Sequence, residues 1–367
     1  MKKYFLFLIA FLTIMQLHAQ NYNLIVGTYT NKGTSEGIYV YDFNGKTAET
    51  NLKSTTKALN PSYLALSKDR KFIYTVNETG KTSAVSAFGF NAKNGTLSFL
   101  NTKSSEGADP CFITVDQKNV LLANYTGGSI AVFGRNADGS LTDAKQIIQH
   151  SGKSIDPKKR QESAHVHQVQ FTPDKKYVIV NDLGEDQVYI YHYNPASADQ
   201  VLTLKNSIKT TPGFGPRHLA FSPNGKFAYL AHEFSGVVST YAYANGNLTK
   251  LQEINSTTKD FTGAIDGADI HVSADGKFLY ETNRGDANAI STFAILPNGT
   301  LKFVETISTL GKGPRNFTID PSGKFLLVAH QYTNEVVIFN RDLNTGKLTD
   351  SGKRIKVGAP VCLVFYK

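Results

Sequence analysis

The chain has 367 residues, a formal net charge of +9, two cysteines and no tryptophan. Two cysteines are too few for a disulfide scaffold, and no spacing of cysteine and histidine matches a zinc site. The basic excess is spread over turn lysines instead of one face, so nucleic acid is not an expected partner.

The first 19 residues differ from the rest of the chain. Lys2 and Lys3 precede an apolar run over residues 4–15, and a short polar stretch ends at Ala19. An apolar core of about a dozen residues is too short to span a membrane and is typical of a secretory signal peptide. We therefore predict that residues 1–19 are a signal peptide and that the mature protein is exported, periplasmic or secreted. No cysteine directly follows Ala19, so we expect no lipid or membrane anchor.

After this segment, one sequence motif recurs about every fifty residues. Two well-preserved copies, residues 215–227 and 313–325, both begin with Gly-Pro-Arg and end with Gly-Lys-Phe. Seven copies are marked by Pro61, Pro110, Val166, Pro216, Gly267, Pro314 and Pro360, which are 49, 56, 50, 51, 47 and 46 residues apart. A period of this length indicates a repeat architecture.

Each repeat has the pattern of four short strands. An apolar stretch runs into a turn of the Asn-Gly, Asp-Gly or Ser-Gly type, and a second apolar stretch such as residues 227–231 follows. A third, alternating segment, such as residues 237–243, leads through another glycine turn into a fourth. Four strands in about fifty residues predict an all-β, seven-bladed β-propeller of four-stranded blades, forming one domain over residues 20–367. The absence of tryptophan argues against the tryptophan-aspartate repeat and quinone-dependent propellers.

The seventh copy stops after its first strand, and the start of the domain supplies the missing ones. Residues 23–28, 37–43 and 51–58 have the patterns of a second, third and fourth strand. We therefore predict that the N- and C-terminal strands share one blade, which closes the ring and removes the exposed sheet edges.

Alignment of the repeats brings polar side chains to one face of the ring. The start of each innermost strand is occupied by Ser62, Cys111, His167, Arg217, Ala268, Arg315 and Val361. The following strand ends at Tyr29, Glu78, Tyr125, Leu183, Glu233, Arg284 and Gln331, and the preceding position includes His232 and His330. Because these two strands are antiparallel, both sets are expected at the same mouth of the central channel.

The ionisable members of these sets fall on one arc. That arc contains His167, Arg217, Glu233, Arg284, Arg315 and His330, with His232 beside them and Glu78 across the ring. Buried charges without partners are costly, so such a cluster either pairs internally or is completed by a ligand. One arginine in this position could equally clamp two blades. For the whole arc we predict a binding site for an anionic ligand.

Other polar residues are expected to have structural roles. Strand alternation directs His165 away from His167, so we predict that His165 supports the site, while His218 and His271 are expected in blade packing. Cys111 and Cys362 belong to repeats that are not neighbours and are predicted to be free, buried thiols. The basic cluster at residues 158–160, in the longest connection between blades, is expected to be a solvated loop.

Several sequence motifs of the repeats resemble those of the propeller-type lactonase family, which includes bacterial 6-phosphogluconolactonases and fungal carboxy-muconate cycloisomerases. The resemblance rests on residues 26–30, 165–174, 180–184, 215–221, 231–233 and 282–284 and covers the mature chain. It implies a catalytic group of one histidine, two arginines and one glutamate, which correspond here to His167, Arg217, Arg284 and Glu233. The choice of His167 over His165 comes from the strand register. Arg315, His330, His232, Glu78 and His165 are expected to bind or support the substrate.

The resemblance implies hydrolysis of a sugar (aldono-)lactone without a metal or other cofactor. His167 or Glu233 would act as the general base and the other as the acid, and the arginines would hold a carboxylate or the oxyanion. Two alternatives stay open: a muconate-type lactonising cycloisomerase, and a non-catalytic exported propeller that binds an anionic glycan or a protein. The expected partner is a small anionic lactone or sugar acid, and the protein is expected to be a monomer or weak homodimer. A phosphorylated sugar lactone is cytoplasmic, whereas this chain carries an export signal.

Overall fold

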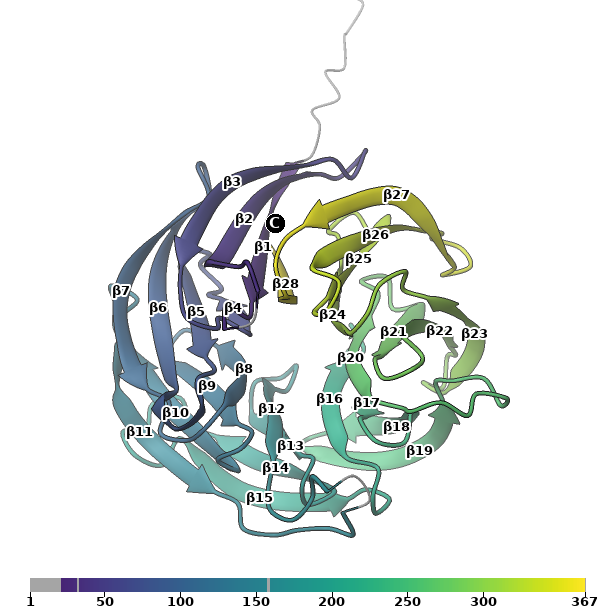
Figure 1. Cartoon of the computed structure of the whole chain (residues 1–367). Coiled ribbons are helices and arrows are strands. Elements are labelled where there is room, and N and C mark those ends of the chain that lie inside the picture. The colour runs from purple at the N-terminus through teal and green to yellow at the C-terminus, as the bar shows by residue number, and fades with distance from the viewer. Residues whose placement is uncertain (1–20, 32, 157–158, 367) are drawn as a thin grey trace, which may run out of the picture.

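The computed structural model describes residues 21–31, 33–156 and 159–366. They form seven four-stranded antiparallel sheets, arranged as blades of a ring (Figure 1). The predicted all-β, seven-bladed propeller is therefore confirmed. The predicted signal peptide, residues 1–19, lies outside the described residues.

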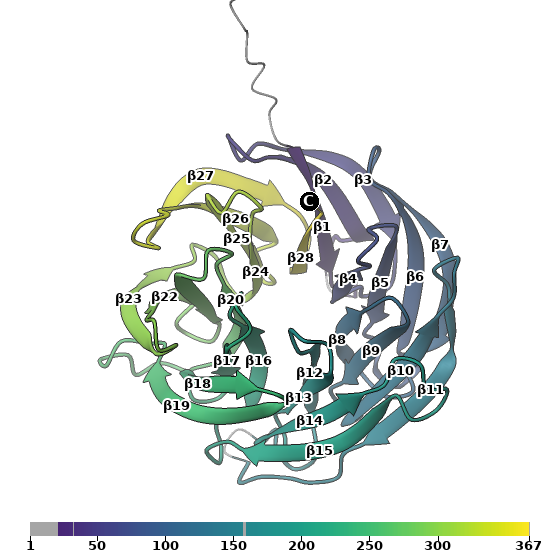
Figure 2. The same cartoon turned by 180° about the vertical axis from the view of Figure 1, so that it is seen from behind.

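The first strand of each blade lies nearest the centre of the ring (Figures 1 and 2). Blade 1 contains β4 (Leu64–Leu66), β5 (Phe72–Asn77), β6 (Ala84–Asn91) and β7 (Thr96–Ser104). Blade 2 contains β8 (Pro110–Val115), β9 (Asn119–Asn124), β10 (Ser129–Arg135) and β11 (Leu141–Gln149). Blade 3 contains β12 (Val166–Phe171), β13 (Tyr177–Asp182), β14 (Gln187–Tyr193) and β15 (Leu202–Lys209).

The second half of the ring continues this order. Blade 4 contains β16 (Pro216–Phe221), β17 (Phe227–His232), β18 (Val237–Ala244) and β19 (Asn247–Asn255). Blade 5 contains β20 (Gly267–Val272), β21 (Phe278–Asn283), β22 (Ala289–Ile295) and β23 (Leu301–Ser308). Blade 6 contains β24 (Pro314–Ile319), β25 (Phe325–His330), β26 (Glu335–Arg341) and β27 (Leu348–Lys356).

Blade 7 joins the two ends of the chain, as the sequence predicted. It contains β28 (Pro360–Tyr366), β1 (Asn21–Thr28), β2 (Gly37–Asn44) and β3 (Thr50–Lys57), in that order from the centre. The C-terminal β28 pairs with β1 in antiparallel register, with Leu24 opposite Phe365 and Val26 opposite Leu363. Both ends of the chain are thus fixed by one sheet, and the ring has no open junction (Figure 1).

Repeated aromatic and glycine residues join several blades to the next one. Phe227, after the Gly-Lys turn of blade 4, packs on Gly299, where a Cβ atom would lie 2.2 Å from the phenylalanine ring. Tyr229 on the same strand donates a hydrogen bond of 3.1 Å to the Gly299 carbonyl oxygen. Phe278 and Tyr280 contact Gly346 in the same way. Only glycine leaves room for this contact, which explains why it recurs in the sequence.

The regular secondary structure of the described residues is nearly all strand. In the described part of the chain the only helical segment is the 3₁₀ turn η1 (Gly80–Thr82), so no helix there has the length or hydropathy to cross a membrane. Apolar clusters fill the spaces between blades, such as the one around Phe278, Phe317 and Phe339. Cys111 and Cys362 are free and buried, as predicted.

Candidate active site

A small cavity of about 190 Å³ lies where the first and second strands of several blades meet. It is lined by Tyr29, Glu78, Cys111, Tyr125, Arg160, His167, Glu233, Arg284 and Arg315. The structure therefore brings together five residues of the predicted site: Glu78, His167, Glu233, Arg284 and Arg315. The sequence analysis did not assign a role in the site to the other four.

Repeated β-bulges aim the inner-strand side chains into this region. In six blades the register between the first and second strands shifts just after the first residue pair. In blades 2, 3, 4, 6 and 7 the residue left without a partner is Cys111, His167, Arg217, Arg315 and Val361, respectively. A bulge releases one residue from the strand ladder and redirects its side chain. The site residues of the inner strands are therefore those that do not take part in regular pairing.

Glu233 is the centre of the charge network. Its carboxylate lies 2.7 Å from Nε of Arg217, 2.6 Å from Nη1 of Arg160 and 3.3 Å from Nη2 of Arg284. Burial alone would raise the pKa of this carboxyl group, but the charges of the three arginines outweigh burial and hold the pKa well below its ordinary value. Glu233 is therefore an ionised anchor for arginines and a poor proton acceptor.

Arg217 lies behind Glu233 and does not line the cavity. Only 1% of its surface is exposed, and its Nη1 donates a hydrogen bond to the carbonyl oxygen of Ala268. Burial and the charge of Arg284 lower the pKa of Arg217 to about 10. Its guanidinium remains charged at neutral pH and offsets the negative charge of Glu233. The structure thus gives Arg217 an indirect position, whereas Arg284 faces the cavity.

His167 is a buried imidazole at the wall of the cavity. Its Nδ1 lies 3.7 Å from Sγ of Cys111, and its ring meets the Tyr125 ring edge-on at 5.5 Å. Burial and the charge of Arg217 lower the pKa of His167 well below its ordinary value. The imidazole is therefore neutral at neutral pH. Burial and the nearby arginines weaken it as a base, and negative charge on a bound ligand would strengthen it. Burial raises the pKa of the Cys111 thiol, so Cys111 is not a thiolate nucleophile.

Arg315 provides free donors on the opposite side of the cavity. Its guanidinium lies over the Tyr29 ring at 5.6 Å, and no other described residue forms a hydrogen bond or ion pair with it. The hydroxyl of Tyr29 donates to Oε2 of Glu78 at 2.8 Å, and Ser62 Oγ donates to the same oxygen at 2.6 Å. The hydroxyl groups occupy Oε2 of Glu78, and the charge of Glu78 acts on Arg315 without an ion pair between them. The donors of Arg315 are therefore available for an oxygen of a ligand.

Arg160 corrects one expectation from the sequence. Its side chain is 41% exposed but has specific partners, because its guanidinium reaches from the connection between β11 and β12 to Glu233 and also lies over the rings of Tyr125 and Phe234. Its Nη2 donates to the Tyr125 hydroxyl at 2.6 Å. The carboxylate of Asp156 accepts the backbone N–H groups of Arg160 and Gln161, which holds this end of the loop.

Three histidines of the predicted site lie outside the cavity. Nδ1 of His165 donates a hydrogen bond of 3.0 Å to the Tyr125 carbonyl oxygen, and the His165 ring stacks on the Tyr125 ring with the centroids 4.6 Å apart. This position agrees with a supporting role. His232 bonds Ser239 on β18 through Nε2 at 2.8 Å, and His330 is fully buried beside Gly311. His232 directly precedes Glu233, and His330 directly precedes Gln331. Because consecutive side chains of a strand point to opposite faces, both histidines are turned away from the cavity.

Two further histidines form a separate network beneath the site. The His218 ring lies 5.1 Å from the His167 ring, and its Nδ1 contacts Asp269 at 2.9 Å. The other carboxylate oxygen of Asp269 contacts Nε2 of His271, also at 2.9 Å. Asp269 thus links blades 4 and 5, in keeping with the packing role predicted for His218 and His271.

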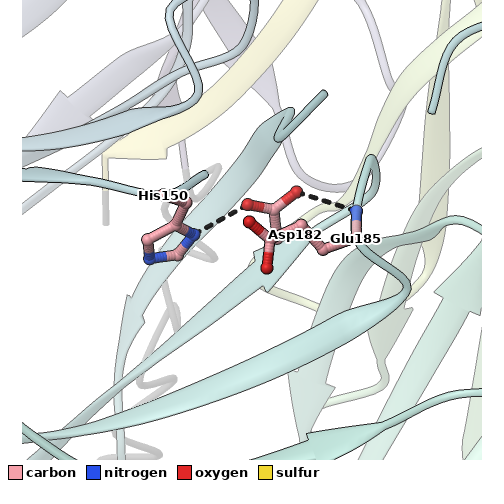
Figure 3. Close-up of side chains that lie close together, drawn as sticks. All are labelled: His150, Asp182 and Glu185. Carbon is pink, nitrogen blue, oxygen red and sulfur yellow. Dashed lines mark hydrogen bonds and ion pairs between the residues drawn. The ribbon is translucent and has the colours of Figure 1, made fainter. Parts of the chain in front are cut away.

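A cluster of His150, Asp182 and Glu185 has donor atoms within 4.8 Å of one another, the composition of a metal site (Figure 3). These donors already have protein partners. Nδ1 of His150 contacts Asp182 at 2.7 Å, Nε2 contacts the Tyr191 hydroxyl at 2.9 Å, and Glu185 accepts from the Gly152 N–H group at 2.6 Å. We interpret the cluster as a hydrogen-bond network that holds the start of the loop carrying Arg160.

Fold and site together define a propeller with a buried histidine and several arginines at one mouth of the ring. The chain matches the model described as "Lactonase, 7-bladed beta-propeller" over residues 23–365, and it belongs to this family. The family resemblance predicted from the sequence is thereby confirmed.

Individual relatives match over nearly their full length. A 6-phosphogluconolactonase of Formosa agariphila is 39% identical over 352 residues, covering 94% of this chain and 99% of the relative. A solved structure from Bacteroides fragilis, provisionally assigned as a 6-phosphogluconolactonase, is 45% identical with a TM-score of 0.91, covering 95% and 98% of the two chains. The periplasmic gluconolactonase PpgL of Pseudomonas aeruginosa is 36% identical with a TM-score of 0.90, covering 95% and 99%.

Proposed function

We propose that this protein is a lactonase that hydrolyses a sugar (aldono-)lactone bound in the mouth cavity. One observation carries the proposal: neutral His167 lines the same small cavity as Arg284 and the unpaired Arg315. A proton acceptor and cationic donors around one bound carbonyl are what ester hydrolysis requires. Hydrolysis is also the activity named for the relatives from Formosa agariphila and Pseudomonas aeruginosa.

In the proposed reaction, a water molecule attacks the carbonyl carbon of the lactone and gives one proton to His167. Arg315 and Arg284 stabilise the negative charge that develops on the carbonyl oxygen. When the bond between the carbonyl carbon and the ring oxygen breaks, His167 returns the proton to that oxygen, which becomes a hydroxyl group. Glu233 holds the arginines in place and is not the proton acceptor, because its carboxylate is engaged by Arg160, Arg217 and Arg284.

The charges favour a lactone without a phosphate group. Arg160, Arg217 and Arg284 are already paired with Glu233, which leaves Arg315 as the unpaired arginine of the cavity. One unpaired guanidinium can balance a developing oxyanion or a carboxylate, whereas a phosphate dianion would leave one negative charge uncompensated. The signal peptide predicted for residues 1–19 and the similarity to a periplasmic protein of Pseudomonas aeruginosa support export of the protein to a compartment where sugar phosphates are scarce. We further propose that the protein acts as a monomer or weak homodimer.

Substitution of His167 tests the proposal. We expect His167→Gln to lower kcat for glucono-1,5-lactone by about 10²- to 10⁴-fold, the usual contribution of a general base, while the inhibition constant of gluconate stays unchanged. Acid release is measured against spontaneous hydrolysis, with His192→Gln, at an exposed position of β14, as the matched control. Full activity of the His167 variant would reject this mechanism. Gluconate binding without turnover in the wild type would instead favour a non-catalytic binding protein, and lactone formation from an unsaturated diacid would favour a cycloisomerase.

A further inference from the structure

A second cavity adjoins the candidate active site. It has a volume of about 220 Å³ and is lined by Tyr29, Asn31, Gln331, Tyr332 and Ala359. Tyr29 also lines the first cavity, so the two share a wall. The lining residues follow the ends of β1 and β25 or precede β28, which places them at the same mouth of the ring as His167. The two cavities have similar volumes, and each has room for one sugar ring.

The second cavity offers unpaired amides and an exposed aromatic ring. The side chains of Asn31 and Gln331 form no hydrogen bond with any described residue, and the Oε1 atom of Gln331 is buried without a partner. A buried amide oxygen without a partner is unfavourable and indicates that a ligand group or water completes it. Tyr332 is 65% exposed, and its ring rests against Gly313, where a Cβ atom would lie 2.6 Å from the ring.

None of the five residues that line this cavity is charged. Binding of a phosphate or carboxylate generally uses arginine, lysine or convergent backbone N–H groups. Carboxamides instead donate and accept hydrogen bonds with hydroxyl groups, and an exposed tyrosine ring offers a flat apolar surface with a polar edge. The second cavity is therefore suited to a neutral, hydroxyl-rich group such as a sugar ring.

We propose that the second cavity is a subsite for a neutral glycosyl group, so that the preferred substrate is the lactone of a disaccharide aldonic acid. The proposal rests on the proposed lactonase function. The lactone ring would lie beside His167 and Arg315, and its glycosyl substituent would extend across Tyr29 towards Gln331 and Tyr332. Because Arg315 lies over the Tyr29 ring, the two subsites meet at this pair. The specificity-determining residues are then Asn31, Gln331 and Tyr332, none of which takes part in the reaction.

The test compares lactones of one and two sugar units. We expect the wild type to hydrolyse cellobiono- or maltobiono-1,5-lactone with a kcat/KM at least about fivefold higher than glucono-1,5-lactone, the effect of a moderate contact residue. Tyr332→Ala and Gln331→Ala should each raise KM for the disaccharide lactones by about fivefold or more. Neither variant should change kcat/KM for glucono-1,5-lactone. Phe99→Ala, which removes an exposed ring on the outer strand β7, is the matched control.

Each alternative outcome has a distinct meaning. Equal wild-type kcat/KM for the two lactone sizes, or variants that affect both sizes equally, would overturn the subsite while leaving the lactonase function intact. A Tyr332→Ala effect confined to 6-phosphogluconolactone would also overturn it, because the cavity would then receive the phosphate group. Absence of turnover for every lactone would reject the proposed function itself. Cellobionate inhibition of glucono-1,5-lactone hydrolysis, weakened in Tyr332→Ala, would support the subsite by an independent measurement.

Discussion

Arg284 is the arginine whose geometry best distinguishes a ligand contact from a structural clamp. Its Nη2 lies 2.9 Å from Asp266 and 3.3 Å from Glu233, and the residue lines the cavity. A guanidinium can serve two carboxylates and a ligand together because it has five donors in one plane, whereas a lysine ammonium is a point charge. The residue type, and not only the charge, is therefore expected to matter here.

We predict that Arg284→Lys lowers kcat/KM for an acidic lactone by an amount equivalent to about 1.5–3 kcal/mol, the value of a hydrogen bond to a charged group. The loss should be smaller for a neutral lactone. Steady-state kinetics and inhibition by the acid product provide the measurement. The control for loss of stability is Arg341→Lys, because Arg341 is similarly buried and donates hydrogen bonds to Tyr280 and Gly323 away from the cavity. Unchanged turnover and product inhibition in Arg284→Lys would identify Arg284 as a clamp between blades.

Glu281 is a buried carboxyl group on β21 with only 1% of its surface exposed. Burial raises its pKa to about 8 from an ordinary value of 4.5. Between these two values the unfolded chain has released the proton while the folded protein keeps it. The stability contribution of this group therefore falls as the pH rises from 4.5 to 8 and stays low above that range.

We predict that Glu281→Gln removes this pH dependence. The free energy of unfolding of the wild type should fall, relative to that of the variant, by about 2–4 kcal/mol between about pH 5 and about pH 9. Urea unfolding at the two pH values gives the difference, and Glu36→Gln, at an exposed position, is the control. Parallel pH profiles for wild type and Glu281→Gln would mean that the carboxyl group is already ionised in the folded protein.

Some site residues could be predicted from the sequence and others could not. Alignment of the repeats correctly predicted that His167, Glu233, Arg284 and Arg315 lie at one mouth of the channel. This was possible because equivalent positions of regular strands occupy equivalent places in each blade. Arg160 lies in a connection without regular structure, so no register places it. Tyr29 and Tyr125 occupy the same aligned position of the repeats as Glu233. Because they carry no charge, the search for ionisable residues did not select them.

At the scale of single strands, β28 has the largest effect on the rest of the fold. It pairs with β1 along its length and packs against blades 1 and 6. Loss of β28 would expose the inner edge of β1, whose residues after Asn21 are all buried. An exposed strand edge of this kind pairs readily with other chains.

We predict that deletion of residues 358–367 makes the protein aggregate. Light scattering and size-exclusion chromatography of the purified variant give the measurement. A synthetic peptide of residues 358–366 added during refolding should partly restore the soluble form, because it can take the place of β28 beside β1. A truncated chain that stays soluble and unfolds cooperatively would show that the shared blade is dispensable.

At the scale of the whole molecule, the compartment decides which substrates are available. The charged and apolar pattern of residues 1–19 predicts export, and the mature chain should begin near Gln20. Expression of the full chain in its natural host, fractionation and N-terminal sequencing would determine this. An intact N-terminus in the cytoplasmic fraction would contradict export and would make a phosphorylated lactone the first substrate to assay.

The overall architecture was more predictable than the site. The glycine turns, the alternation of apolar and polar residues and the period of about fifty residues predict where the strands lie. The incomplete seventh repeat predicts how the ring closes. Contacts between loops and blades depend on side chains that are distant in the sequence, such as Arg160 with Glu233. The neighbouring position occupied by His232 and His330 was misplaced because consecutive side chains of a strand point to opposite faces, so these histidines are directed away from the cavity.

The repeated bulge also has a consequence for how such proteins diversify. In five blades one side chain is released from backbone pairing, while the residues around it hold the sheets together. A substitution at that position changes what the ring presents to a small molecule at little cost to folding. Five such positions, varied independently, allow a single scaffold to change its substrate from one ester to another over evolutionary time. A designer could exploit the same independence by building libraries confined to those five positions.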